Sequence, residues 1–183
     1  MTPIEQYLDA LDRITGDPNP KFIQSPFLEG PKPPVFAVTY KNYPAPGLMT
    51  CITSGLSFAE HDEWVSYKPE LLLTVQSSDE AWPLALAFTA HQGRGKYAFL
   101  INDTIDFRAQ ISTESQMSGF FICEQTLFEK NKHVIHMPSG HIVLHQLIPI
   151  YAGELGKIRA EDRNWLYAKK FDPYDVTRKD ESL

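Results

Sequence analysis

The sequence predicts a single α+β domain in which helices pack on a mixed, largely antiparallel sheet. Short apolar runs rich in Val, Ile, Leu and Thr recur along the chain and are bounded by Gly, Pro and charged residues, as strands are. Two helical patterns, one amphipathic and one almost entirely apolar, accompany these runs. A chain of 183 residues that is 43% hydrophobic suits one core. We therefore expect one domain over residues 1–183, with its core at 35–170.

Residues 1–16 carry the signals of an amphipathic helix. Thr2 is placed to cap the helix, Pro3 suits its first turn, and Glu5 completes a capping box. The apolar face consists of Ile4, Tyr7, Leu8, Leu11 and Ile14. Residues 17–34 are rich in proline and glycine, which predicts a wrap over the domain surface or a linker, not a helix or a central strand.

Three strands are expected next, at 35–40, 48–56 and 70–75, and because loops join them in sequence we expect them to be antiparallel. A helix follows, capped by Ser78 or Asp79 and running to about His91. Its residues are apolar nearly all round, so it should be buried.

The second half of the chain continues the alternation of strands and helices. Four further strands are expected, at 97–101, 117–123, 133–137 and 141–151. Residues 153–170 have a helical pattern. The charged tail at 171–183 is expected to be frayed.

The net charge of −6 is unevenly distributed, because residues 1–91 hold 11 acids and 5 bases, whereas residues 92–183 hold 12 of each. This balance disfavours nucleic acid as a partner, since phosphate binding needs clustered Lys and Arg. It favours a basic protein partner. The sequence contains neither a signal-peptide pattern nor an apolar run long enough to span a membrane. We expect a soluble, cytoplasmic protein with no membrane contact.

An acidic loop between the strands at 48–56 and 70–75 is the candidate partner-binding surface. The proposed contact residues are Glu60, Asp62, Glu63, Trp64 and Tyr67. Its Trp and Tyr side chains combine a large contact area with a polar group and are frequent interface hot spots. Neighbouring acids would steer a basic partner towards them. The alternative is that both aromatic side chains pack into the core under the loop.

A group of four histidines raises the alternative of a metal site. These are His133, His136, His141 and His145. Residues along a strand alternate between its faces, so the four cannot all reach one ion. Across a hairpin, His136 and His141 could face each other, with Glu124 or Glu129 supplying a carboxylate. This leaves a metal-dependent hydrolase as an alternative function, beside the simpler interpretation as ordinary strand histidines.

Other patterns give no support for catalysis. The segment Gly93-Arg94-Gly95-Lys96 follows a helix and lacks the spacing of a phosphate-binding loop. Cys51 and Cys123 lie in apolar runs without a C-x-x-C spacing, which favours buried thiols in a reducing compartment. We expect a non-enzymatic protein that has no cofactor.

Five sequence blocks, found in a fixed order, resemble the Suppressor of fused (SUFU) domain family. They are Gly-Leu-Ser at 55–57, Glu-Leu-Leu-Leu-Thr at 70–74, Ala-Trp-Pro-Leu-Ala-Leu-Ala at 81–87, Asn-Asp-Thr-Ile at 102–105, and His-Gln-Leu-Ile-Pro-Ile-Tyr at 145–151 running into Glu-Leu at 154–155. The resemblance covers roughly residues 30–170 and depends on the order and number of the blocks, since each block alone is a common apolar pattern.

The resemblance implies a fold like the SUFU N-terminal domain and a non-enzymatic, protein-binding role. Animal members clamp an extended peptide of Gli-type transcription factors between two domains, and their contacts follow the Gly-Leu-Ser block. Here Phe58, Ala59 and Glu60 stand where a tyrosine-containing segment is expected, so Gli-type binding is not carried over. For short bacterial members the resemblance implies an immunity protein that neutralises a toxin. A general intracellular adaptor is the other possibility.

Overall fold

The computed structural model describes residues 1–17, 19–25, 33–130 and 132–183. In chain order the elements are α1 (Pro3–Thr15), β1 (Lys21–Gln24), β2 (Phe36–Lys41), β3 (Met49–Ser54), β4 (Lys68–Val75), α2 (Ala81–Gly93), β5 (Thr104–Asp106), β6 (Gly119–Glu124), β7 (Val134–Met137), β8 (Gly140–Ile150), α3 (Ala152–Ala160) and a 3₁₀ turn, η1 (Trp165–Ala168). None of the helices in these ranges combines the length and apolarity that a membrane crossing requires.

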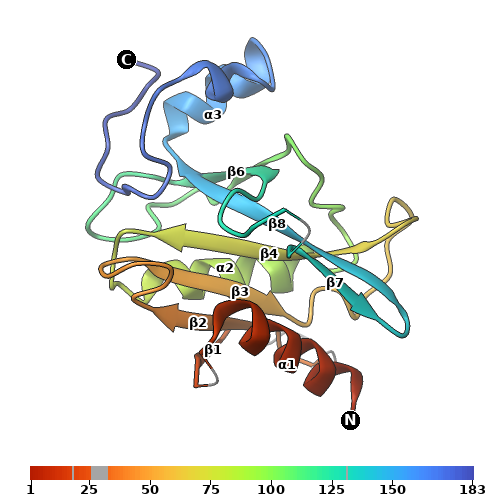
Figure 1. Cartoon of the computed structure of the whole chain (residues 1–183). Coiled ribbons are helices and arrows are strands. Elements are labelled where there is room, and N and C mark those ends of the chain that lie inside the picture. Colours follow the sequence, from red (N-terminus) through yellow and green to blue (C-terminus); the bar gives the residue numbers. More distant parts are fainter. Residues whose placement is uncertain (18, 26–32, 131) are drawn as a thin grey trace.

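One eight-stranded sheet organises the described residues, in the order β1-β2-β3-β4-β8-β6-β5, with β7 also paired to β8. The pair β4–β8 is parallel and the other pairs are antiparallel. Along one edge of β8, β7 pairs with residues 140–143 and β6 with residues 145–150. Figure 1 shows α1 on one face of the sheet and α2 on the other. The predicted α+β fold with a mixed, largely antiparallel sheet is confirmed.

The N-terminal helix forms as its sequence predicts. The Glu5 N–H donates to Thr2 Oγ1 (3.3 Å) and the Thr2 N–H donates to Glu5 Oε2 (2.6 Å), which completes the capping box. Gly16 ends the helix with a φ of 73°. Tyr7 fixes α1 to the sheet, because its buried hydroxyl donates to the backbone oxygen of Thr53 at 2.8 Å.

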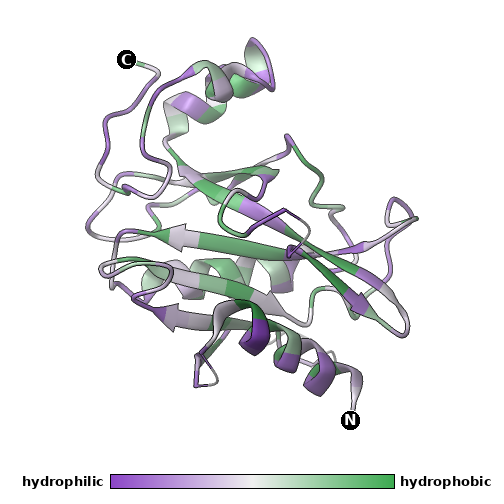
Figure 2. Cartoon of the chain, viewed as in Figure 1, coloured by the Kyte–Doolittle hydropathy of each residue, from purple (hydrophilic) through white to green (hydrophobic). Residues whose placement is uncertain are grey.

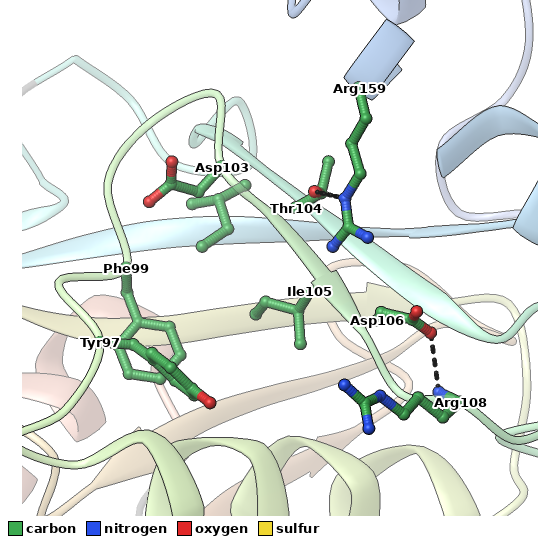
Figure 3. A pocket seen from close by; sticks show the side chains of 9 residues that line it. Tyr97, Phe99, Asp103, Thr104, Ile105, Asp106, Arg108 and Arg159 are labelled. Atoms are coloured by element: carbon green, nitrogen blue, oxygen red, sulfur yellow. Dashed lines mark hydrogen bonds between the residues drawn. The ribbon is translucent and has the colours of Figure 1, made fainter. Parts of the chain in front are cut away.

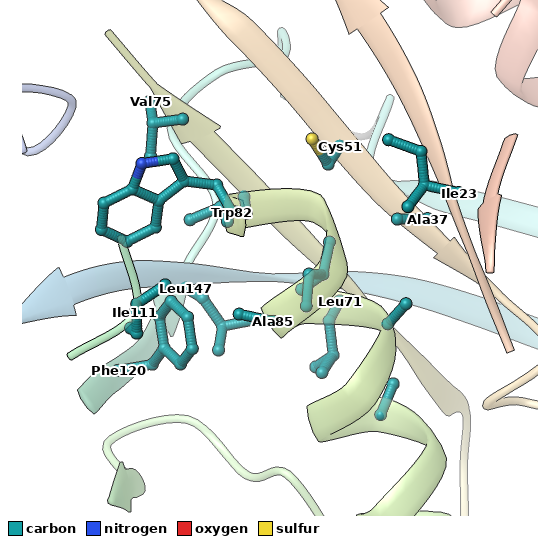
Figure 4. Close-up of a cluster of buried hydrophobic side chains, with 14 of the residues drawn as sticks. Ile23, Ala37, Cys51, Leu71, Val75, Trp82, Ala85, Ile111, Phe120 and Leu147 are labelled. Atoms are coloured by element: carbon teal, nitrogen blue, oxygen red, sulfur yellow. The ribbon is translucent and has the colours of Figure 1, made fainter. Parts of the chain in front are cut away.

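The apolar helix α2 is buried, as predicted. The predicted cap at Ser78 or Asp79 is wrong, because the helix begins after Glu80, whose side chain makes no capping bond. Asp79 lies one residue earlier, and its Oδ1 accepts from the Ala81 N–H at 3.0 Å. Trp82, at the start of α2, belongs to a buried cluster between this helix and the sheet (Figure 4). The colouring in Figure 2 shows the contrast with α1, which is hydrophilic along its outer face. Helix α2 packs its apolar residues on one face of the sheet. Helix α1 and the β7–β8 hairpin pack on the other face.

The structure corrects three predicted elements. The wrap predicted at 17–34 contains an edge strand, β1, although residues 18 and 26–32 lie outside the described residues. The strand predicted at 97–101 does not form, because Phe99 and Asn102 have φ values of 54° and 72°, which strands do not accommodate. The helix predicted at 153–170 ends at Ala160, and η1 follows it.

The charged tail was predicted to be frayed, and this prediction is wrong. Arg178 is buried and its two terminal nitrogens lie 2.5 and 2.8 Å from the carboxylate oxygens of Glu154, which is also buried. The same guanidinium donates to the backbone oxygen of Pro149 at 3.2 Å. The Gln76 N–H donates to the backbone oxygen of Tyr174 at 2.7 Å, which ties the tail to the end of β4. The tail is therefore part of the domain.

Replacing the buried arginine tests this correction. Arg178→Ala leaves the Glu154 carboxylate buried without its cation, so the free energy of unfolding should fall by about 3 kcal/mol or more, measured by urea denaturation. The neighbouring Lys179 is exposed, and Lys179→Ala should change stability by about 0.5 kcal/mol or less. Equal, small effects of the two substitutions would show that the tail contributes little.

Candidate protein-binding surface

The loop that follows β3 is held at its start by a buried carboxylate, Glu70. Its Oε1 accepts from the N–H groups of Gly55 (3.1 Å) and Ser57 (2.9 Å) and from the Ser57 hydroxyl (2.6 Å), and its Oε2 accepts from the Thr53 hydroxyl (2.5 Å). Burial raises the pKa of the Glu70 carboxyl, and these hydrogen bonds partly offset the increase. Two of the sequence blocks, Gly-Leu-Ser and Glu-Leu-Leu-Leu-Thr, therefore meet at one side chain.

The two aromatic residues of the loop are partly buried. The Trp64 Nε1–H donates to the backbone oxygen of Ala98 at 2.8 Å, and the indole packs against the main core cluster. Tyr67 contacts the buried His145 edge to face, with ring centroids 5.4 Å apart. Both side chains are thus largely packed against the domain, as the alternative prediction held. Their contacts also fix the loop to the sheet.

The acidic residues of the loop lie on the surface. Asp62 and Glu63 are exposed, and Glu60 forms an ion pair with Lys68, with Nζ and Oε1 2.5 Å apart. Val65, next to the anchored Trp64, is 87% exposed. Sequence reasoning missed Val65, because an isolated valine gives no signal until the burial of its neighbours is known.

A groove of about 310 Å³ lies between this loop and the β7–β8 hairpin. Its lining includes Phe58, Trp64, Val65, Tyr67 and His141. The contribution of the hairpin to this groove was not predicted, because the parallel pairing of β4 with β8 joins segments more than 70 residues apart. We call residues 58–68 and 137–142 together the loop–hairpin face.

The predicted histidine pair forms, but Glu124, predicted as its carboxylate partner, does not lie beside it. His136 and His141 are register partners, with their Nδ1 atoms 3.0 Å apart. Glu124 instead lies opposite His145, four residues and about 13 Å along β8 from His141. Within the described ranges, no three His, Cys, Asp or Glu residues are grouped closely enough to hold a metal ion. The structure thus separates the carboxylate from the histidine pair.

The two cysteines are buried, free thiols. Burial raises the pKa of the Cys51 thiol to about 12 and that of the Cys123 thiol to about 12. Both thiols therefore stay protonated near neutral pH, and protonated thiols are weak nucleophiles.

A second cavity, of about 320 Å³, lies along β5, and its lining includes the acidic residues Asp103 and Asp106 (Figure 3). Arg108 and Arg159 line it, and neither forms an ion pair in the described part of the chain. The Arg159 Nε–H donates to Thr104 Oγ1 at 3.0 Å. The loop–hairpin face thus carries exposed carboxylates, whereas two arginines and two aspartates together line this cavity.

The mixed eight-stranded sheet and its flanking helices define the class of this protein as an α+β domain. Within that class, the chain belongs to the Suppressor of fused protein (SUFU) family, whose model matches residues 31–180. The resemblance seen in the sequence is confirmed. No curated protein matches the sequence significantly.

Solved structures with the same fold include a SUFU homolog from Neisseria gonorrhoeae FA 1090, with a TM-score of 0.74 and 13% identity over 97% of this chain and 96% of that one. A chain of the Sufu–Fu complex aligns with a TM-score of 0.71 and 16% identity, over 97% of this chain and 91% of that chain. Drosophila Suppressor of Fused aligns with a TM-score of 0.69 and 17% identity, over 97% of this chain and half of that chain. At these identities the likeness establishes the fold.

Glu70 gives a pH-dependent prediction. Its pKa in the folded protein is raised above the unfolded value of about 4.3. The protonated side chain therefore adds its whole contribution to the free energy of unfolding below pH ~4.3, and this contribution is lost as the pH rises through the folded pKa. The stability difference between wild type and Glu70→Gln should therefore shift in favour of the variant as the pH rises from 4 to 8, measured by urea denaturation.

Glu70→Ala is the companion variant, because it leaves the buried N–H groups of Gly55 and Ser57 without their hydrogen-bond acceptor. It should cost about 3 kcal/mol or more at every pH. A pH-independent difference between wild type and the glutamine variant would contradict the raised pKa.

Proposed function

We propose that this chain is a non-enzymatic, protein-binding domain that holds its partner on the loop–hairpin face. The observation that carries the proposal is Val65, a strongly exposed apolar residue beside an anchored tryptophan and a groove of about 310 Å³. Loops fixed on a rigid scaffold lose little conformational entropy on binding. The Sufu–Fu complex shows that a protein of this fold assembles with another protein.

The partner proposed for this face is a basic protein. Asp62 and Glu63 are exposed and form no ion pair among the described residues, so their charges are available to a partner. Acidic side chains around an apolar contact raise the association rate with a basic surface and disfavour nucleic acid. Trp64 and Tyr67 also line the groove and offer aromatic surface to a partner.

The cellular role that we propose is immunity, in which this protein neutralises a basic toxin. Toxins that act on nucleic acid are commonly basic, and an acidic face can occupy their active site. An immunity gene stands beside the gene of its toxin, so co-expression with the product of the neighbouring gene is the direct test. Co-purification together with loss of toxicity supports immunity. Binding without any toxicity would indicate a general adaptor instead.

Removing two charges from the loop tests the electrostatic part of the proposal. Asp62→Asn with Glu63→Gln should slow association with the partner about tenfold at low salt and leave the dissociation rate nearly unchanged, as measured by surface plasmon resonance. Glu161→Gln with Asp162→Asn is the matched control, because it neutralises an adjacent, exposed acidic pair beyond α3. Equal slowing by both double variants would assign the effect to net charge alone.

Two neighbouring substitutions separate binding from folding. Val65→Ser removes an exposed side chain, so stability should change by about 0.5 kcal/mol or less while the affinity falls about tenfold. Trp64→Ala should weaken binding by about 2 kcal/mol or more and also destabilise the fold, since it removes the bond to Ala98 and part of the core. Calorimetry and thermal unfolding measure both effects. Unchanged affinity of the folded Val65→Ser variant would place the interface elsewhere.

A further inference from the structure

We propose that His136 and His141 form a two-imidazole site for a divalent first-row transition-metal ion, with copper(II) preferred. The two residues are direct partners across the β7–β8 hairpin, both are exposed, and their Nδ1 atoms are 3.0 Å apart. This site is independent of the partner-binding proposal and does not involve Glu124.

The backbone holds the two imidazoles on the same side of the hairpin. Residues directly opposite each other in an antiparallel pair project from the same face, and their Cβ atoms lie about 5 Å apart. The next pair, Ile135 and Ile142, is buried, which fixes the hairpin against the domain from its opposite face. Gly140 closes the turn with a φ of 130°, a value that L-residues with side chains rarely adopt. The rings are therefore brought together before any ion binds.

The two nitrogens are close enough together to bind one ion. Metal–imidazole bonds of about 2.05 Å place two nitrogens about 2.9 Å apart at a 90° angle and about 3.3 Å apart at the tetrahedral angle. The 3.0 Å separation, set in the free protein by the hydrogen bond between the rings, lies between these two values. Square-planar and tetragonal sites with nitrogen ligands favour Cu(II) and Ni(II), and copper also has the highest affinity in the Irving–Williams order.

The protonation chemistry of binding is simple. In the free protein one Nδ1 carries the hydrogen that lies between the two rings, as the short contact requires. On metal binding this hydrogen moves to Nε2 of the same ring, so both rings coordinate as neutral imidazoles through Nδ1. The ligands therefore add no charge to that of the ion. No third His, Cys, Asp or Glu stands near enough in the described ranges, so water fills the remaining positions.

The site also faces towards the proposed interface. His141 lines the groove of the loop–hairpin face together with Tyr67 and Gly140. A side chain of a bound partner can therefore replace one of the waters, but the two-histidine site does not need the partner.

Titration of the full chain, purified without a polyhistidine tag, with Cu²⁺ alone tests the proposal. Calorimetry in a non-chelating buffer should give one ion per chain, and electron paramagnetic resonance should show an axial Cu(II) signal with two nitrogen ligands. The affinity for Cu²⁺ should exceed that for Zn²⁺ by at least tenfold.

Variants locate the site. His136→Ala and His141→Ala should each lower the Cu²⁺ affinity at least tenfold, and the double variant should show only the background from other groups, the N-terminal amine included. His61→Ala is the control, since it removes a partly exposed imidazole from the acidic loop and should leave the affinity unchanged. Because His136 and His141 are exposed, thermal unfolding should confirm that the variants fold. Retained Cu²⁺ affinity in the double variant, or a preference for Zn²⁺, would overturn the proposal.

Discussion

The buried carboxylate of Glu70 is the constraint on which the arrangement of the binding face depends. Its four hydrogen bonds determine how the chain leaves β3, because two of them satisfy the backbone N–H groups of Gly55 and Ser57 and the other two hold the hydroxyls of Thr53 and Ser57. The carbonyl oxygen of the same Gly55 accepts from Arg94 at 3.3 Å, so α2 holds the other side of that residue. Gly55 has a φ of 118°, which a larger residue would not tolerate. The start of the acidic loop is thus held in one position relative to the sheet and α2.

The irregular segment after α2 connects this loop to the centre of the sheet. Within 97–101, the Ala98 oxygen accepts from Trp64 and the Phe99 oxygen lies 2.8 Å from Nδ1 of His145, which therefore donates to it. A regular strand here would use its carbonyl oxygens in a ladder. Because the left-handed conformation of Phe99 interrupts the strand, two carbonyl oxygens remain for side chains of the binding face and of β8.

The sequence predicted those parts of the fold that local patterns encode. The capping box of α1, the all-apolar α2 and the strands β2, β3 and β4 follow from periodicity and from capping residues. The edge strand β1 was missed because proline and glycine dominate its surroundings. The ordered tail was missed because burial of Arg178 depends on Glu154, a partner 24 residues away, and charge composition alone predicts exposure. The acidic loop was predicted, but its anchoring and the exposed Val65 depend on tertiary contacts.

The parallel pair β4–β8 explains why the binding face has two halves. In a parallel pair both strands begin at the same end of the sheet, and here Lys68 lies opposite Ile142. The loop that enters β4 and the hairpin that enters β8 must therefore emerge side by side, as Figure 1 shows. The remaining edge of β8 is divided between β7 and β6, so the hairpin can project past the end of β6. A groove at this end follows from the strand order, and the residues of the loop and hairpin then determine what it binds.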